Sequence, residues 1–141
     1  MKTDKQSPVA ALVSLASLNV NAACDTPFTF DFLDPDGNET GIKISVIGKE
    51  STPVKAWLKA NLNKRRVVEA RELKMGKAKT RRVEDDEAFG HEYLAVRVVG
   101  WEGIKEECSL ENVMTLCEIN PSFVQQVELH SENLSNFMTS K

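Results

Sequence analysis

Two runs of alternating apolar and polar residues flank a turn, and this arrangement constrains the fold more than any other feature of the chain. Residues 28–32 carry Phe at every second position, and residues 42–46 carry Ile or Val at every second position. Successive side chains of a strand point to opposite faces, so each run predicts a β-strand with one apolar face. Between them, residues 34–38 read Asp-Pro-Asp-Gly-Asn, in which Pro presets φ and Gly accepts a positive φ. We therefore predict a β-hairpin over residues 27–48.

The apolar face of this hairpin must be covered, because two strands alone are marginally stable in water. We expect a helix to supply this cover. The next element along the chain is predicted to be a helix from about residue 52. Thr52 is a good helix cap and Pro53 suits the first turn. Apolar residues then follow at helical spacing, namely Val54, Trp57, Leu58 and Leu62.

The C-terminal part of the chain, residues 85–138, has the periodicity of short helices. Its first segment places Phe89, Tyr93 and Val96 at positions i, i+4 and i+7, and we expect this helix to end at Gly100. The β-branched residues at 96–99 also suit a strand, so that alternative stays open.

Two further helices have clear start signals. Ser109 is a good cap for a helix with an apolar stripe, and Asn120 with Pro121 opens the last helix. One face of that last helix carries Phe123, Val127, His130 and Leu134. Three short helices in succession predict a small packed bundle.

These elements predict an α+β fold that is mainly α, with an N-terminal β-hairpin packed on a small bundle of short helices. The chain has 141 residues, 41% of them hydrophobic, which suits one domain with a sizeable core. We expect that domain to span residues 26–141. An N-terminal arm is expected over residues 1–25.

The arm contains an apolar stretch, residues 9–18, that has two interpretations. It imitates a secretory leader or a lipoprotein signal, although two serines interrupt it and Asp4 dilutes the positive charge before it. A short amphipathic helix after Pro8 fits better, because apolar residues recur at helical spacing. The stretch is shorter than the roughly 20 apolar residues that span a bilayer, so we do not expect this chain to be an integral membrane protein.

Charge is unevenly distributed along the chain. The net charge is −3, yet residues 64–82 hold nine Lys or Arg and two Glu, a local charge of +7, and residues 84–87 are all acidic. We expect residues 74–83 to form a basic connector, since they include few apolar residues. The segment from Lys64 to Arg82 has three interpretations: a nucleic-acid surface, a solvated helix face that meets the acidic run, and a contact with an acidic surface on a second subunit. The segment lacks interleaved aromatics, which makes nucleic acid the weaker interpretation.

The sequence contains no recognisable catalytic or metal-binding motif. Signatures of acyl transfer, nucleotide hydrolysis and dinucleotide binding are missing, and the three cysteines form no CxxC pair. His91 and His130 are far apart, and neither has a ligand at metal-binding spacing. We therefore expect no enzyme, no catalytic residue, no metal and no cofactor. The unpaired cysteine pattern also favours a reducing compartment.

Residues 94–104 combine an apolar segment with a large aromatic, Trp101, between Gly100 and Gly103. A tryptophan at the end of an element either closes the core or anchors an interface. Both interpretations of Trp101 stay open.

With the helix starts that follow it, this run resembles the tail assembly chaperones of long-tailed, siphovirus-type bacteriophages. The residues that carry the resemblance are Val-Arg-Val-Val-Gly-Trp-Glu-Gly at 96–103, Cys-Ser-Leu-Glu-Asn at 108–112, Asn120-Pro121 with Phe123 and Gln126, and residues 133–137. The hairpin followed by a Trp-bearing helix is also similar. The strongly basic segment 64–82 departs from the family pattern.

The resemblance implies a non-enzymatic protein of the bacterial host cytoplasm that is absent from the mature virion. Such a chaperone binds the tape measure protein, keeps it soluble and helps to recruit the tail tube protein, often through a longer frameshifted form. Two other classes stay open: a small nucleic-acid-binding protein that uses Lys64 to Arg82, and a secreted or lipid-anchored protein.

For such a chaperone we predict two groups of residues that contact the partner protein or another copy of the chain. Short amphipathic helices suit recognition of a long helical partner, and many copies on one partner favour a homo-oligomer. The apolar group of predicted contacts is Trp101, Phe123, Val127 and His130. A charged group offers a head-to-tail contact between copies and consists of Arg81, Arg82, Asp85 and Asp86.

Overall fold

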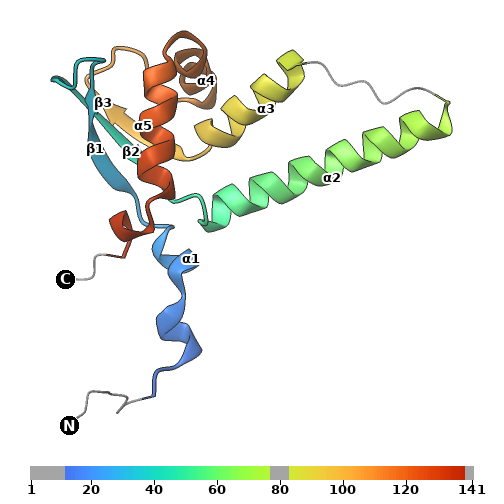
Figure 1. Cartoon of the computed structure of the whole chain (residues 1–141), viewed down its shortest axis with the longest axis horizontal. Helices are drawn as coiled ribbons and strands as arrows, with labels where there is room; N and C mark the ends of the chain where they lie inside the picture. Colours follow the sequence, from blue (N-terminus) through green and yellow to red (C-terminus); the bar gives the residue numbers. More distant parts are fainter. Residues whose placement is uncertain (1–11, 77–82, 139–141) are drawn as a thin grey trace.

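The computed structural model describes residues 12–76 and 83–138 (Figure 1). Over these residues the chain forms a three-stranded antiparallel sheet and several helices, which confirms the predicted α+β, mainly α class. In chain order the elements are η2 (Leu15–Leu18), α1 (Val20–Ala23), β1 (Phe28–Leu33), β2 (Glu39–Val46), α2 (Thr52–Lys74), α3 (Val83–Ala95), β3 (Val98–Glu102), α4 (Leu110–Ile119), α5 (Pro121–Glu132) and η3 (Leu134–Asn136).

The predicted hairpin is formed by β1 and β2, which pair antiparallel with Phe30 opposite Ile44. In the turn, the Asp34 carboxylate accepts hydrogen bonds from the backbone N–H groups of Asp36 and Asn38, both at 2.9 Å. Gly37 has a φ of +90°, the left-handed conformation for which glycine is suited. The local turn chemistry therefore sets the register of the two strands.

A third strand, β3, occupies part of the segment that we expected to be helical, so this prediction was wrong. α3 ends at Ala95, and β3 pairs antiparallel with β2, with Trp101 opposite Ile44. The predicted helical part, residues 85–138, thus contains a strand. β-branched residues favour extended backbone, and the free edge of β2 supplies hydrogen-bond partners. Gly100 lies inside the strand and does not end a helix.

The core lies between the sheet and the C-terminal helices, where α5 crosses one face of the sheet and α4 packs beside α5 (Figure 1). Both helices start at the predicted caps. The side chains of Ser109 and Asn120 each accept a backbone hydrogen bond at 3.2 Å, from Asn112 and Phe123 respectively. The fully buried core includes Ile44, Val46, Val113, Phe123 and Val127.

α2 extends away from this body as a long helix (Figure 1). Pro53 lies in its first turn as predicted, but Ser51 is the cap and Thr52, the predicted cap, is the first helical residue, whose hydroxyl donates a hydrogen bond to the Asp25 carboxylate. Val54 is buried while the rest of the helix is at least partly exposed. The predicted basic connector is only partly described: Lys74 belongs to α2 and Val83 to α3, whereas residues 77–82 lie outside the described residues. No helix in the described part of the chain has both the length and the apolar character needed to cross a bilayer.

The described part of the N-terminal arm projects from the body (Figure 1). The amphipathic helix expected after Pro8 is absent over residues 12–14, and η2 and α1 each form about one turn. Leu12 and Leu15 are 96% and 89% exposed, so no packing supports a longer helix here, and short helices without tertiary contacts are marginal. Cys24 is fully buried in the core, so the anchored part of the chain begins before the predicted boundary at residue 25.

Candidate functional site: an apolar pocket beside Trp101

An apolar pocket of about 360 Å³ lies between the sheet and α4. Its apolar lining comes from strands, helices and the loop after β3, namely Phe32, Ile42, Ile44, Trp101, Ile104, Leu116, Ile119 and Phe123. Polar side chains at its edge are Glu106, Asn112, Thr115 and Asn120. The volume is at the lower end of the range for ligand sites, roughly 300–1,000 Å³. Such a hollow suits the apolar side chains of a partner.

Trp101 is positioned on β3 by its pairing with Ile44 on β2. Its ring is partly buried and packs against the core cluster, and it also lines the pocket. The indole N–H donates a hydrogen bond of 2.9 Å to the backbone carbonyl of Glu106. Trp101 therefore contributes to the core while its remaining surface borders the pocket.

The loop after β3 folds back toward the pocket at Gly103. This residue has a φ of +91°, and a Cβ added to it would lie 3.0 Å from the carbonyl oxygen of Gly41 and 3.2 Å from Cα of Ile42. Both the left-handed backbone and the close approach require glycine. The turn brings Ile104 and Glu106 to the pocket.

α4 supplies the wall opposite the loop. The side-chain amide of Asn112 donates a hydrogen bond of 2.9 Å to the carbonyl of Glu107, which ties the loop to the start of the helix. Leu116 and Ile119 lie almost one turn apart and both line the pocket. Ile119 is 71% exposed, so this wall presents apolar surface that the chain itself leaves uncovered.

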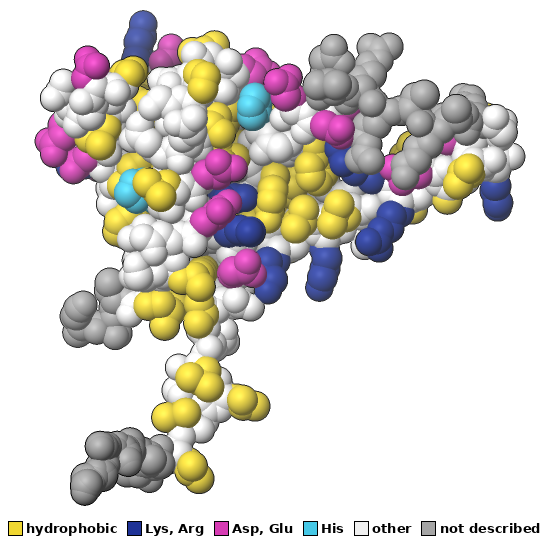
Figure 2. Space-filling model, in the orientation of Figure 1, with side chains coloured by type: hydrophobic (Ala, Val, Ile, Leu, Met, Phe, Trp, Pro, Cys, Tyr) yellow, Lys and Arg dark blue, Asp and Glu magenta, His cyan; other side chains and the backbone are white. Residues whose placement is uncertain are grey.

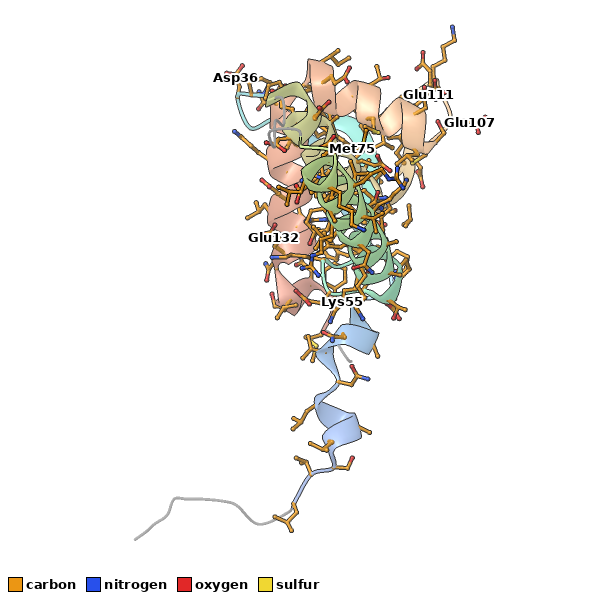
Figure 3. The ribbon with its side chains drawn as sticks, turned by 90° about the vertical axis from the view of Figure 1, so that its right-hand side faces the viewer. Asp36, Lys55, Met75, Glu107, Glu111 and Glu132 are labelled. Atoms are coloured by element: carbon orange, nitrogen blue, oxygen red, sulfur yellow. The ribbon has the colours of Figure 1, made fainter. Side chains whose placement is uncertain are left out.

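Acidic residues gather near the rim of the pocket. Glu106, Glu107 and Glu111 are all exposed, and with Lys105 they give residues 103–111 a net charge of −2. Glu102 follows Trp101 in β3, so its side chain points to the other face of the sheet, beside Lys43. Figure 3 shows Glu107 and Glu111 at the same corner of the molecule, well separated from Lys55. We call this group the acidic rim, and its charge favours a basic partner.

Phe123 and Val127 are fully buried in the core, although we expected them to contact a partner. An amphipathic helix buries its apolar stripe in its own domain first, and α5 does so against the sheet. The Phe123 ring meets the Phe32 ring edge-on, with centroids 6.0 Å apart, and both rings line the pocket. Phe123 therefore shapes the site from within the core.

His130 is also part of the domain's own packing and does not line the pocket. Its ring stacks on Phe30 with centroids 4.1 Å apart and an interplanar angle of 18°, and it lies 5.8 Å from the Phe28 ring. Burial lowers the pKa of His130, because the charged imidazolium loses solvation against these rings.

The predicted charged contacts are described only in part. Asp85 and Asp86 are exposed on α3, whereas Arg81 and Arg82 lie outside the described residues. The guanidinium of Arg65 on α2 lies 3.5 Å from the Asp86 carboxylate and 3.9 Å from the centre of the Phe89 ring. The basic helix thus meets the acidic run within one chain, as the solvated-face interpretation predicted.

Trp57 holds α2 against α3. Its ring stacks on Tyr93 with centroids 5.7 Å apart, and its indole N–H donates a 3.0 Å hydrogen bond to the Glu92 carboxylate. Figure 2 shows apolar side chains gathered where α2 meets the body, with Lys and Arg along the outer edge of α2. These contacts fix the base of α2 and leave its far half projecting.

Of the eight apolar side chains that line the pocket, we predicted Trp101 and Phe123 as contacts and missed the other six, which include Ile42, Ile104 and Ile119. For Ile119 there was a signal, because a large apolar residue outside the apolar stripe of an amphipathic helix is a candidate contact. The position of Ile104 follows from the turn at Gly103 and from the pairing of β3, so local patterns do not reveal it.

The arrangement is suited to binding. Over the described residues, no group of three or more His, Cys, Asp or Glu side chains is placed to hold a metal ion. Burial raises the pKa of all three cysteine thiols, that of Cys117 to about 11, so they stay protonated at neutral pH and are poor nucleophiles. Glu106 is the single ionisable side chain in the pocket lining.

Three of the four segments on which the expected family resemblance rests meet at this pocket, whereas residues 133–137 do not line it. Residues 96–103 supply Trp101, residues 108–112 form the start of α4, and Asn120 with Phe123 lines the pocket at the start of α5. Comparison with known proteins adds no relative: no family model matches the chain, and no curated protein or solved structure is significantly similar to it.

Proposed function

We propose that this protein is a non-enzymatic tail assembly chaperone of a long-tailed bacteriophage and that it binds the tape measure protein through the pocket beside Trp101. The observation that carries the proposal is the convergence of three of the four family-like segments on one apolar pocket. Ile119 leaves one wall of that pocket open to a partner.

Recognition of a helix in a groove explains how the pocket selects its partner. A tape measure protein is a long, helical and apolar chain, so its amphipathic segments aggregate unless they are covered. Such a segment inserts apolar side chains from successive turns into the pocket, while the polar edge at Asn112, Thr115 and Asn120 accommodates its flanks. Covering the apolar stripe keeps the partner in solution.

The wider role belongs to the same proposal. The chaperone acts in the host cytoplasm, helps to recruit the tail tube protein through a longer frameshifted form, and is absent from the mature virion. Many copies bound along one tape measure chain favour a homo-oligomer.

Co-expression with the tape measure protein of the same phage tests this function. Ile119→Asp places a carboxylate on the exposed pocket wall, where partner binding would bury it without a counter-charge. We expect the captured soluble tape measure protein to fall about tenfold, equivalent to roughly 1.4 kcal/mol. Leu129→Asp is the matched control, because Leu129 is 64% exposed, compared with 71% for Ile119, and lies on α5 outside this pocket.

Circular dichroism should show that both variants keep the wild-type fold, since both side chains are exposed. Equal capture by the two variants would contradict the assignment of the pocket. A wild-type chain that leaves the tape measure protein insoluble would contradict the chaperone function itself.

A nucleic-acid-binding protein is the second candidate, favoured by the charge of +5 that seven Lys or Arg and two Glu give α2. Phosphate contacts predict binding whose logarithm falls with the logarithm of salt by about 0.9 per contact. However, the exposed Leu62 and Leu73 of α2 have no counterpart in a phosphate backbone. Absence of DNA or RNA binding at low salt eliminates this candidate.

A further inference from the structure

The far half of α2 exposes more apolar surface than a solvated helix requires. Val67 and Leu73 are 57% and 70% exposed, and Met75, the residue that caps the helix, is 62% exposed. Figure 1 shows this half of the helix projecting beyond the body, away from the sheet. Large apolar side chains gathered on one projecting element indicate an interaction surface.

One face of α2 combines apolar side chains with positive charge. Lys59, Leu62, Arg66 and Leu73 are separated by three, four and seven residues, which places them along a single face of the helix. All four side chains are exposed, and Figure 2 shows Lys and Arg along the outer edge of α2. We call this face the basic strip.

The Trp101 pocket has the complementary composition. Its interior is apolar and its wall at Ile119 is open, while the acidic rim gives residues 103–111 a net charge of −2. The strip around Arg66 and Leu73 fits this arrangement, because Leu73 enters the pocket while Arg66, about 10 Å away along the helix, faces the glutamates.

We infer that the basic strip of one copy occupies the Trp101 pocket of a second copy. Within one chain, α2 leaves the body on the side opposite the hairpin strands that help to line the pocket, so a chain does not fill its own pocket (Figure 1). The two surfaces differ, which makes the contact head-to-tail. Head-to-tail contacts give rings or open chains that grow with concentration.

A second copy explains the basic strip better than nucleic acid does. Phosphates would neutralise Lys59 and Arg66 but would leave Leu62 and Leu73 exposed to water. The pocket of another copy accommodates both kinds of side chain. The clustered positive charge of α2, which departs from the family pattern, is then explained by contact with the acidic rim of another copy.

This inference rests on the proposed function in one respect, that the pocket binds a helix. It adds that the free chaperone covers its pocket with the α2 of a neighbour until the tape measure protein displaces that helix. Self-association and capture of the tape measure protein therefore compete for one site.

Sedimentation velocity of the full chain tests the contact. Arg66→Glu on the basic strip and Glu106→Arg on the acidic rim should each raise the dissociation constant of self-association about tenfold, because each places like charges together. The combination of both changes should restore association. Lys105→Glu is the matched control for Arg66→Glu: it alters the net charge equally but acts at the acidic rim, so it should not weaken association.

A wild-type chain that stays monomeric at its highest attainable concentration would overturn the inference. A combined variant that fails to recover would do so as well, as would equal losses in Arg66→Glu and Lys105→Glu. Nucleic acid that co-purifies with the wild type and is lost in Arg66→Glu would assign α2 to nucleic acid instead.

Capture of the tape measure protein separates this inference from the proposed function. Arg66→Glu should capture at least as much of it as the wild type, since the pocket is intact and less occupied. Loss of capture in Arg66→Glu would overturn the inference. If the wild type self-associates through these surfaces but captures no tape measure protein, the self-contact stands and the proposed function fails.

Discussion

His130 lies nearly parallel to the ring of Phe30, and its neighbours on the apolar stripe of α5, Phe123 and Val127, are fully buried. Helical spacing identified these three residues of α5 correctly, but it was wrong about Leu134, which lies beyond the end of α5 in η3 and is 43% exposed. The spacing does not distinguish a face that packs on its own sheet from one that waits for a partner, because both need apolar residues at the same positions. Burial in the structure makes that distinction: Trp101 and His130 stay partly exposed, and of these two only Trp101 lines the pocket.

The environment of His130 predicts how stability depends on pH. Burial lowers its pKa below the usual value of 6.5, so the unfolded chain binds this proton more readily than the folded chain does. The free energy of unfolding should therefore fall as pH drops from about 7 through 6.5 and should level off below the pKa of the folded state. Urea unfolding over this pH range measures the effect. His130→Phe, which preserves a stacked ring, should remove this part of the dependence, and an unchanged profile would contradict the assignment.

Elements with local signals could be predicted from the sequence, whereas those set by distant contacts could not. The Asp-Pro-Asp-Gly-Asn turn and the caps at Ser109 and Asn120 all act within a few residues, and the hairpin, α4 and α5 begin where expected. β3 was assigned as helix because its residues suit either state, and its pairing with β2 joins segments far apart in the chain. The pocket depends on that pairing, so only Trp101 and Phe123 of its lining were among the predicted contacts.

The turn after β3 yields a prediction at this scale. Gly103 and Gly37 both have φ near +90°, where alanine costs roughly 1–2 kcal/mol. A Cβ at Gly103 would also press on the Gly41 carbonyl, whereas a Cβ at Gly37 would meet nothing within 4 Å. Gly103→Ala should therefore lower the free energy of unfolding by about 1–3 kcal/mol more than Gly37→Ala. Equal losses in denaturant titrations would show that the loop does not need this close approach.

Two surfaces of opposite charge lie apart on the molecule, although the net charge of the chain is only −3. α2 carries +5 and projects from one side of the body, and the acidic rim carries −2 beside the pocket (Figures 1 and 3). The sequence shows that both segments are charged, but it does not show where they lie in the folded molecule. The orientation of α2 depends on the contacts of Trp57 with α3. The proposed function and the self-contact both depend on one site, the apolar pocket beside Trp101.

Fluorescence of Trp101 tests that dependence most directly. Trp57→Phe leaves Trp101 as the one tryptophan of the chain, and its ring is partly exposed at the pocket. Titration of this variant with an amphipathic helical peptide from the tape measure protein should shift the emission to shorter wavelength and reach saturation, because the bound helix excludes water from the indole. Binding of the peptide, detected by calorimetry, without any change in Trp101 emission would contradict the central claim that the partner occupies this pocket.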